Sequence, residues 1–191
     1  MDMVLSAFGK RMEISSIAIS LWMIGVVASL SGCAHRDGEM MNDANILALI
    51  SVANNADIEG GWLAQRKGEH DLVRSYGARM EREHIRMINQ AATLSKQLAV
   101  KPVLSATGQD FHQEHQRAST TLTEVPSGAF DELYIDHAIR MHERAIRDFD
   151  RAVGMVERSE LRKWLKQARP RLEEHLQAAK EVKQTLSRSR R

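Results

Sequence analysis

Four side chains able to bind metal stand at positions where the helical pattern of this 191-residue chain calls for an apolar residue. They are Glu59, His84, His142 and His175, one in each of four long segments whose apolar residues recur at spacings of three and four. An inward-facing Glu or His costs free energy unless it is paired or coordinated. The pattern therefore predicts one shared polar centre whose carboxylate and neutral imidazoles suit iron, copper or zinc, without selecting among them.

The segments that must position these residues are predicted to be helices. The expected ranges are about 43–67, 69–100, 127–153 and 159–186. Between the second and third, a connection bracketed by Pro102 and Pro126 holds a polar stretch, 108–122, that can form a short crossover helix.

A connection of this length can run the whole length of a helical bundle, so that the second and third helices point the same way. With a rise of 1.5 Å per residue, the four candidate ligands then fall in a layer about 9 Å deep. The sequence thus predicts an all-α, ferritin-like four-helix bundle with a long crossover connection between helices 2 and 3. The alternative is an up-down bundle with a disordered loop.

Several further residues could hydrogen bond to the histidines. Glu81 precedes His84 by three residues, a Glu-x-x-His step of the kind found in di-iron bundles, but the other helices lack this step, so a ferroxidase is not expected. Asp131, Tyr134 and Asp136 are the other candidates. With such partners, the histidines could also form a buried network without metal, and both interpretations stay open. Catalytic residues other than those of a metal site are not identified, so an enzyme would have to be a metalloenzyme, and the sequence favours a non-enzymatic role without excluding that one.

The N-terminal segment has the order of a bacterial export signal. The basic residues Lys10 and Arg11 precede an apolar run, 17–30, which is too short for a confident membrane span. The following Leu-Ser-Gly-Cys ending at Cys33 is similar to the lipobox of bacterial lipoproteins. The expected organisation is an export signal at 1–32, lipidated Cys33 with a tether over 33–42, a bundle domain at 43–187 and a basic tail at 188–191.

The expected location is the cell envelope, with the membrane as partner through the lipid on Cys33. Ala34 and His35 stand where an inner-membrane retention signal would place an aspartate, which favours the periplasmic face of the outer membrane. The net charge of +2, with both signs mixed along the chain, gives no reason to expect nucleic-acid binding. Protein partners and a homo-oligomeric state are left open.

Several short motifs, taken in their order, resemble a known family. They are Glu59 with Leu63-Ala64, Met80 before His84, Phe130-Asp131 with Tyr134, His142, and Pro170 with Leu172 and His175-Leu176. Over about residues 44–185 they are similar to an uncharacterised ferritin-like domain family of predicted outer membrane proteins, domain of unknown function 4142. Its recurrent polar positions fall on Glu59, His84, Asp131, Tyr134, His142 and His175 here, while Glu83 and Arg169-Pro170 depart from its pattern.

The resemblance implies a helical-bundle protein of the bacterial envelope, often carrying an export signal, with no established activity. Together with the inward Glu and His residues, it leads us to expect an envelope lipoprotein that binds a transition metal. The alternative is a structural or protein-interaction lipoprotein whose buried histidines only hold the bundle together.

Overall fold

The computed structural model describes residues 41–189, and this part of the chain is helical with no strand. Its five helices belong to one compact unit. They are α1 (Asp43–Lys67), α2 (Asp71–Gln97), α3 (Ala106–Glu124), α4 (Ser127–Met155) and α5 (Ser159–Ser189). The all-α prediction is therefore confirmed. The predicted export signal, Cys33, most of the tether and the last two residues of the basic tail lie outside the described residues.

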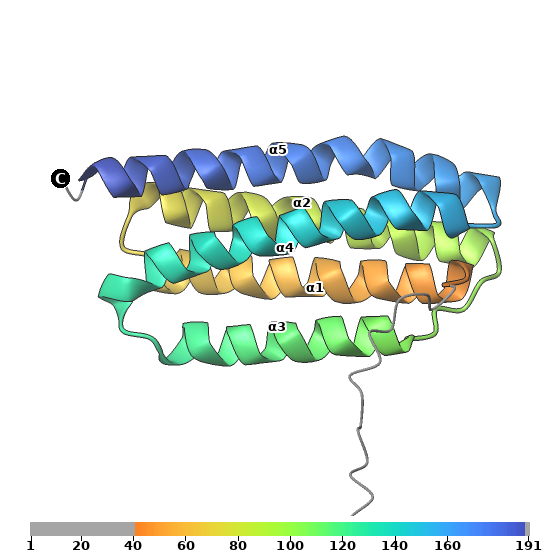
Figure 1. Ribbon diagram of the computed structural model, residues 1–191, viewed down its shortest axis with the longest axis horizontal. Coiled ribbons are helices and arrows are strands. Elements are labelled where there is room, and N and C mark those ends of the chain that lie inside the picture. Colours follow the sequence, from red (N-terminus) through yellow and green to blue (C-terminus); the bar gives the residue numbers. More distant parts are fainter. Residues whose placement is uncertain (1–40, 190–191) are drawn as a thin grey trace, which may run out of the picture. The chain divides into compact units, whose positions relative to one another are not determined.

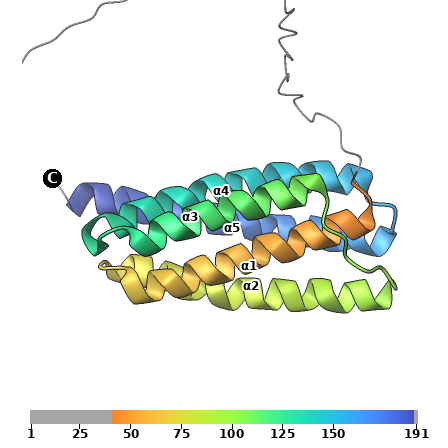
Figure 2. The same ribbon diagram turned by 90° about the horizontal axis from the view of Figure 1, so that it is seen from below.

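The helices lie side by side, and each runs in the direction opposite to the one before it in the chain (Figure 1). A short turn joins α1 to α2, and another joins α4 to α5. The polar connection was predicted to contain only a short helix, but α3 has 19 residues and packs against both α1 and α4 (Figure 2). Because α3 returns the chain to the end where α2 began, α2 and α4 run in the same direction. None of the helices formed by the described residues is both long and apolar enough to cross a membrane.

Local capping sets the ends of α1. The Asn42 side chain accepts a hydrogen bond from the Asn45 backbone N–H, and the Asn45 side chain accepts one from the Asn42 backbone, which together form a capping box. Asp43, the first residue of the helix, does not cap it. Its buried carboxylate instead accepts hydrogen bonds from the backbone N–H groups of Glu157 and Arg158, at 2.9 and 3.1 Å, just before α5. Asp43 therefore ties the start of α1 to the start of α5.

Two glycines allow α1 and α2 to pack unusually closely. A Cβ atom on Gly61 would lie 2.5 Å from the backbone oxygen of Gly77, and one on Gly77 would lie 2.7 Å from the Cβ of Ala64. Any side chain at these positions would push the two helices apart. The close approach brings polar side chains of α1 within hydrogen-bonding reach of α2.

The buried apolar side chains form two clusters. One contains Ile46, Ile50, Met87, Leu161 and Leu172, and the other contains Val73, Met80, Phe130, Ile135 and Ala179. His84 stands between Met80 and Met87 in the sequence of α2, and His175 stands between Leu172 and Ala179 in α5. A polar layer therefore separates the two halves of the core.

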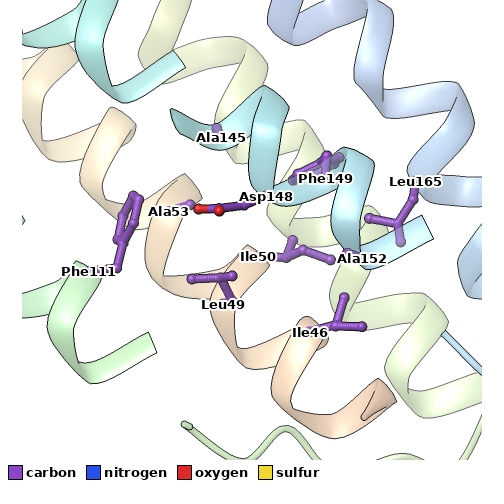
Figure 3. Close-up of a pocket in the computed structure, with 10 residues that line it drawn as sticks. All are labelled: Ile46, Leu49, Ile50, Ala53, Phe111, Ala145, Asp148, Phe149, Ala152 and Leu165. Atoms are coloured by element: carbon purple, nitrogen blue, oxygen red, sulfur yellow. The ribbon is translucent and has the colours of Figure 1, made fainter. Parts of the chain in front are cut away.

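The first cluster encloses a small cavity of about 20 Å³, drawn in Figure 3. Ile50 and Ala53 of α1, Ala145 and Phe149 of α4, and Phe111 of α3 are among its lining residues. That volume holds about one water-sized sphere. Because the lining is apolar apart from Asp148, we interpret the cavity as a packing gap rather than a site for a polar ligand.

Candidate metal centre

Three of the four predicted ligands meet in the polar layer. His84 of α2, His142 of α4 and His175 of α5 each place one ligand nitrogen within 4.8 Å of the other two. The rings are 2%, 1% and 0% exposed, and their centroids lie 5.0–5.8 Å apart. We call these residues the tri-histidine centre. Three imidazoles this close in the core need an explanation, because unpaired polar groups are costly there.

A hydrogen bond to α1 fixes the protonation of His84. The Asn54 side-chain N–H donates to the backbone oxygen of Ile50 at 2.7 Å, which turns the amide oxygen of Asn54 toward His84. That oxygen can only accept, so His84 Nδ1 carries the proton and donates at 2.9 Å. The Nε2 atom of His84 is then left with a lone pair.

The other two histidines are fixed in the same manner. His142 Nδ1 lies 2.9 Å from the backbone oxygen of Ala138, an acceptor, and therefore donates to it. His175 Nε2 donates to the Glu83 carboxylate at 2.7 Å, and Glu83 also accepts from Arg79 at 3.0 Å. The lone pairs are therefore on His142 Nε2 and His175 Nδ1. Both atoms are buried and, like His84 Nε2, have no hydrogen-bond partner.

This arrangement matches what a metal ion needs and what a water molecule cannot supply. A neutral water donates two hydrogen bonds, so it cannot satisfy three lone pairs, whereas one cation can accept all three. Histidines that bind metal commonly donate their second N–H to a carboxylate, a carbonyl or another acceptor. All three histidines have such an acceptor here, in Asn54, Ala138 and Glu83.

The spacing of the nitrogens also suits an ion. Three imidazole nitrogens bound at about 2.1 Å in tetrahedral geometry lie about 3.4 Å apart. One nitrogen of each ring lies within 4.8 Å of one from each of the other two rings, and nitrogens at this spacing would move inward by less than about 1 Å to bind. Side-chain rotation can supply a movement of this size without a change of fold.

Burial lowers the pKa of two of the three histidines, His84 and His175, and a carboxylate lies beside the centre. Burial lowers the pKa of His84, and burial together with the nearby His84 lowers the pKa of His175 to about 4. Asp57 of α1 has Oδ2 3.6 Å from His84 Nδ1. Burial alone would raise the pKa of Asp57, but the interactions with His84 and the other two histidines outweigh it and lower that pKa. A carboxylate beside neutral imidazoles is a favourable environment for a divalent cation.

The structure does not bring Glu59, the fourth predicted ligand, to this centre. Its carboxylate accepts hydrogen bonds from His115 Nε2 at 3.2 Å and from the Ser119 hydroxyl at 2.6 Å, both on α3. The prediction placed Glu59 on the apolar stripe of α1, but α1 has a second neighbour in α3, and Glu59 faces that neighbour. The carboxylates beside the histidines are instead those of Glu83, 2.7 Å from His175 Nε2, and Asp57, 3.6 Å from His84 Nδ1.

Of the four predicted supporting residues, one lies near the centre. Burial and the charge of Asp57 raise the pKa of Tyr134, which stacks on Phe130 beside the polar layer. The other three hold the helices together elsewhere. Glu81 accepts from Gln65, Asp131 accepts from the backbone N–H groups of Glu69 and His70, and Asp136 pairs with Lys183.

The supporting residues that the sequence analysis missed are Asn54, Asp57 and Glu83. Asn54 and Asp57 are three residues apart on α1, and Gly61 follows four residues later, so all three share the helix face turned toward α2. This spacing of polar residues was the sequence signal that could have identified Asn54 and Asp57. Glu83 directly precedes His84 in the sequence. This position gives no indication that the Glu83 carboxylate contacts a histidine on another helix, His175.

No curated protein and no solved structure shows significant similarity to the chain. A protein-family profile does match, over residues 31–182, which includes four of the helices completely and most of α5. The match contains all three histidines of the centre and the acceptors that orient them. The chain therefore belongs to the family described as domain of unknown function, DUF4142.

Proposed function

We propose that this protein binds one transition-metal ion through Nε2 of His84, Nε2 of His142 and Nδ1 of His175. The observation that carries the proposal is a cluster of three buried histidines, each with one ring nitrogen that has no hydrogen-bond partner. The opposite nitrogen of each ring is held by an acceptor, so the rings are already oriented for binding. Three protein ligands leave one position of a tetrahedral ion open, as in zinc sites that bind water or substrate.

The donor set limits the metal but does not name it. Neutral imidazoles suit zinc, copper and iron, and the order of affinities alone would favour copper. Asp57 offers the negative charge that offsets the ion, whereas imidazole ligands offer none. We therefore propose a divalent cation of this group as the resident ion.

We also propose that the protein is an envelope lipoprotein, anchored through Cys33 on the periplasmic face of the outer membrane. The lipobox-like sequence before Cys33 supports this, and so does the preceding apolar run. For the fold, we infer a ferritin-like bundle of α1, α2, α4 and α5 with α3 as its crossover, which the common direction of α2 and α4 supports. A Cys33→Ser variant should move from the membrane to the soluble fraction, and its retention in the membrane would contradict the anchor.

Metal analysis of the purified full chain tests the proposed centre. After reconstitution with zinc, copper or iron, we expect one ion per chain in the wild type and none in the His84→Ala/His142→Ala variant. His70→Asn is the matched control. It removes an imidazole outside the centre, and asparagine can still cap α2, as His70 does by accepting from the Leu72 backbone N–H.

Two results would overturn the proposed site. If the wild type holds no ion after reconstitution, the three histidines serve as core residues that hold the bundle together. If the double variant retains the ion, the ion is bound elsewhere. Loss of the ion in His70→Asn would equally contradict the assignment.

A further inference from the structure

A second group of imidazoles and a carboxylate lies where α3 meets its neighbours. His115 of α3 donates from Nε2 to Glu59 of α1, and Ser119 donates to the same carboxylate. The His115 side chain is 8% exposed, and its Nδ1 atom has no hydrogen-bond partner. Glu59 is 57% exposed, so this group connects solvent to a buried, unpaired nitrogen.

His137 of α4 extends this group inward. Its ring centroid lies 6.3 Å from that of His115. Burial, together with the nearby His115, lowers the pKa of His137 to about 4, so the ring is neutral and able to bind a cation. His137 directly precedes Ala138, whose backbone oxygen holds His142 Nδ1. Asp57 lies two residues before Glu59 on α1, and its Oδ2 is 3.6 Å from His84 Nδ1. Ligand groups therefore continue from the surface at Glu59 to the tri-histidine centre.

The opposite side of the centre is less suited to a cation. There, Glu83 lines a surface hollow together with Arg86 and Arg171. The Glu83 carboxylate is already held by Arg79 and His175. Positive groups at this hollow repel an approaching cation, whereas the carboxylate of Glu59 on the α3 side attracts one.

We propose that metal ions reach the tri-histidine centre from the α3 side, passing from Glu59 and His115 to His137 and then to Asp57 beside His84. This inference rests on the proposed function, because it needs the centre to be the destination. Glu59, His115 and His137 act as transient ligands on the way, whereas Asp57 also offsets the charge of the bound ion. They hold the ion weakly, since they do not form a closed set of three ligand atoms as the tri-histidine centre does.

The route has a kinetic signature that a structural role does not share. A residue used only in passage stabilises the ion on its way in and on its way out. Removing it slows binding and release by the same factor, so the dissociation constant is unchanged. A residue of the centre itself behaves differently, because its removal weakens binding at equilibrium.

Stopped-flow absorbance with Co²⁺, which reports coordination directly, tests the route in the purified full chain. We expect His115→Gln and His137→Gln to slow loading and chelator-driven release at least about tenfold, the lower range of electrostatic and local-concentration effects. The dissociation constant should stay within about twofold of the wild-type value. Glu143→Gln is the matched control, because it removes a carboxylate from α4 that pairs with Lys180 of α5. It should load at the wild-type rate.

The outcomes separate the route from the centre. Normal rates in both variants, with one Co²⁺ bound per chain, would overturn the route and leave the centre intact. A raised dissociation constant in either correctly folded variant would also overturn it, since that residue would then act at equilibrium. No Co²⁺ uptake by the wild type would overturn the proposed function itself. Circular dichroism checks the fold, and Glu59→Gln, at an exposed position, supplies a third slow-loading variant should a buried substitution fail to fold.

Discussion

The molecule contains two histidine–glutamate pairs in very different surroundings. His175 donates to Glu83 at 2.7 Å, and His115 donates to Glu59 at 3.2 Å. The Glu83 side chain is 21% exposed and also accepts from Arg79, whereas Glu59 is 57% exposed and accepts from the Ser119 hydroxyl. The same chemical pair is thus held firmly at the tri-histidine centre and loosely at the surface.

The difference shows what a largely buried and anchored glutamate adds to the histidine that it holds. At the centre, the anchored carboxylate fixes which nitrogen of His175 carries the proton, and the ring lies 5.0 and 5.4 Å from the rings of His84 and His142. Beside α3, the ring of His115 lies 6.3 Å from that of His137, and His115 Nδ1 has no hydrogen-bond partner. We therefore assign tight binding to the first pair and passage of the ion to the second.

Removing metal should produce the largest effect and should separate the two regions. An ion present at a thousand times its dissociation constant stabilises the native state by about 4 kcal/mol. For a chain of this size, that corresponds to a melting temperature about 8–16 °C higher than in the metal-free protein. Thermal melts with and without a chelator should show this difference in the wild type and in His115→Gln. The difference should vanish in His84→Ala/His142→Ala. If it persisted in that variant, the assignment of tight binding to the tri-histidine centre would be wrong.

A pH dependence of the metal-free protein comes next in size. The folded pKa of His175 is about 4, below its ordinary value of 6.5, because burial disfavours the charged ring. Below pH 6.5 the unfolded chain gains a proton at His175 that the folded chain does not. Stability therefore falls as the pH drops from about 6.5 to about 4, by roughly 3 kcal/mol, and His175 contributes no further change below that range.

Urea unfolding in the presence of a chelator, at pH 7 and at pH 4.5, measures this loss. His175→Gln should reduce it, and His70→Asn should leave it unchanged. Part of the loss should remain in His175→Gln, because His137 also has a lowered pKa, of about 4, and acts in the same direction. An identical pH dependence in His175→Gln and the wild type would mean that His175 gains its proton equally in both states.

The helices were predictable from the sequence because local signals set their ends. The predicted first range, 43–67, matches α1, whose ends coincide with the Asn42 capping box and with Gly68. The length of α3 was underestimated, since its polar sequence buries only a few side chains, such as Phe111 and His115. A mostly polar helix that packs against two neighbouring helices shows only weak hydrophobic periodicity in its sequence.

The three histidines were predictable because each stands on a stripe that faces the centre of the bundle. The same argument was wrong for Glu59, because the stripe of inward-facing residues on α1 is wide and contacts several neighbouring helices. Asn54 and Asp57 face α2 and the centre, while Glu59 faces α3. Helical spacing tells which residues are inward, but only the packing of a fifth helix decides which neighbour an inward residue meets.

Glu83→Gln and Glu59→Gln compare the two pairs directly and involve the smallest effects. Glutamine keeps the size of the side chain but removes the charge that holds the histidine. Loss of an outer partner of a metal-bound histidine typically weakens metal binding by about 10–100-fold, so Glu83→Gln should raise the dissociation constant by that factor. Glu59→Gln should leave it within about twofold and cost less than about 1 kcal/mol of stability, as expected for an exposed ionic contact. Equilibrium titration with Co²⁺ measures both constants. Equal changes in the two variants would mean that the surface pair holds the ion as firmly as the buried one, and the distinction between binding and passage would fail.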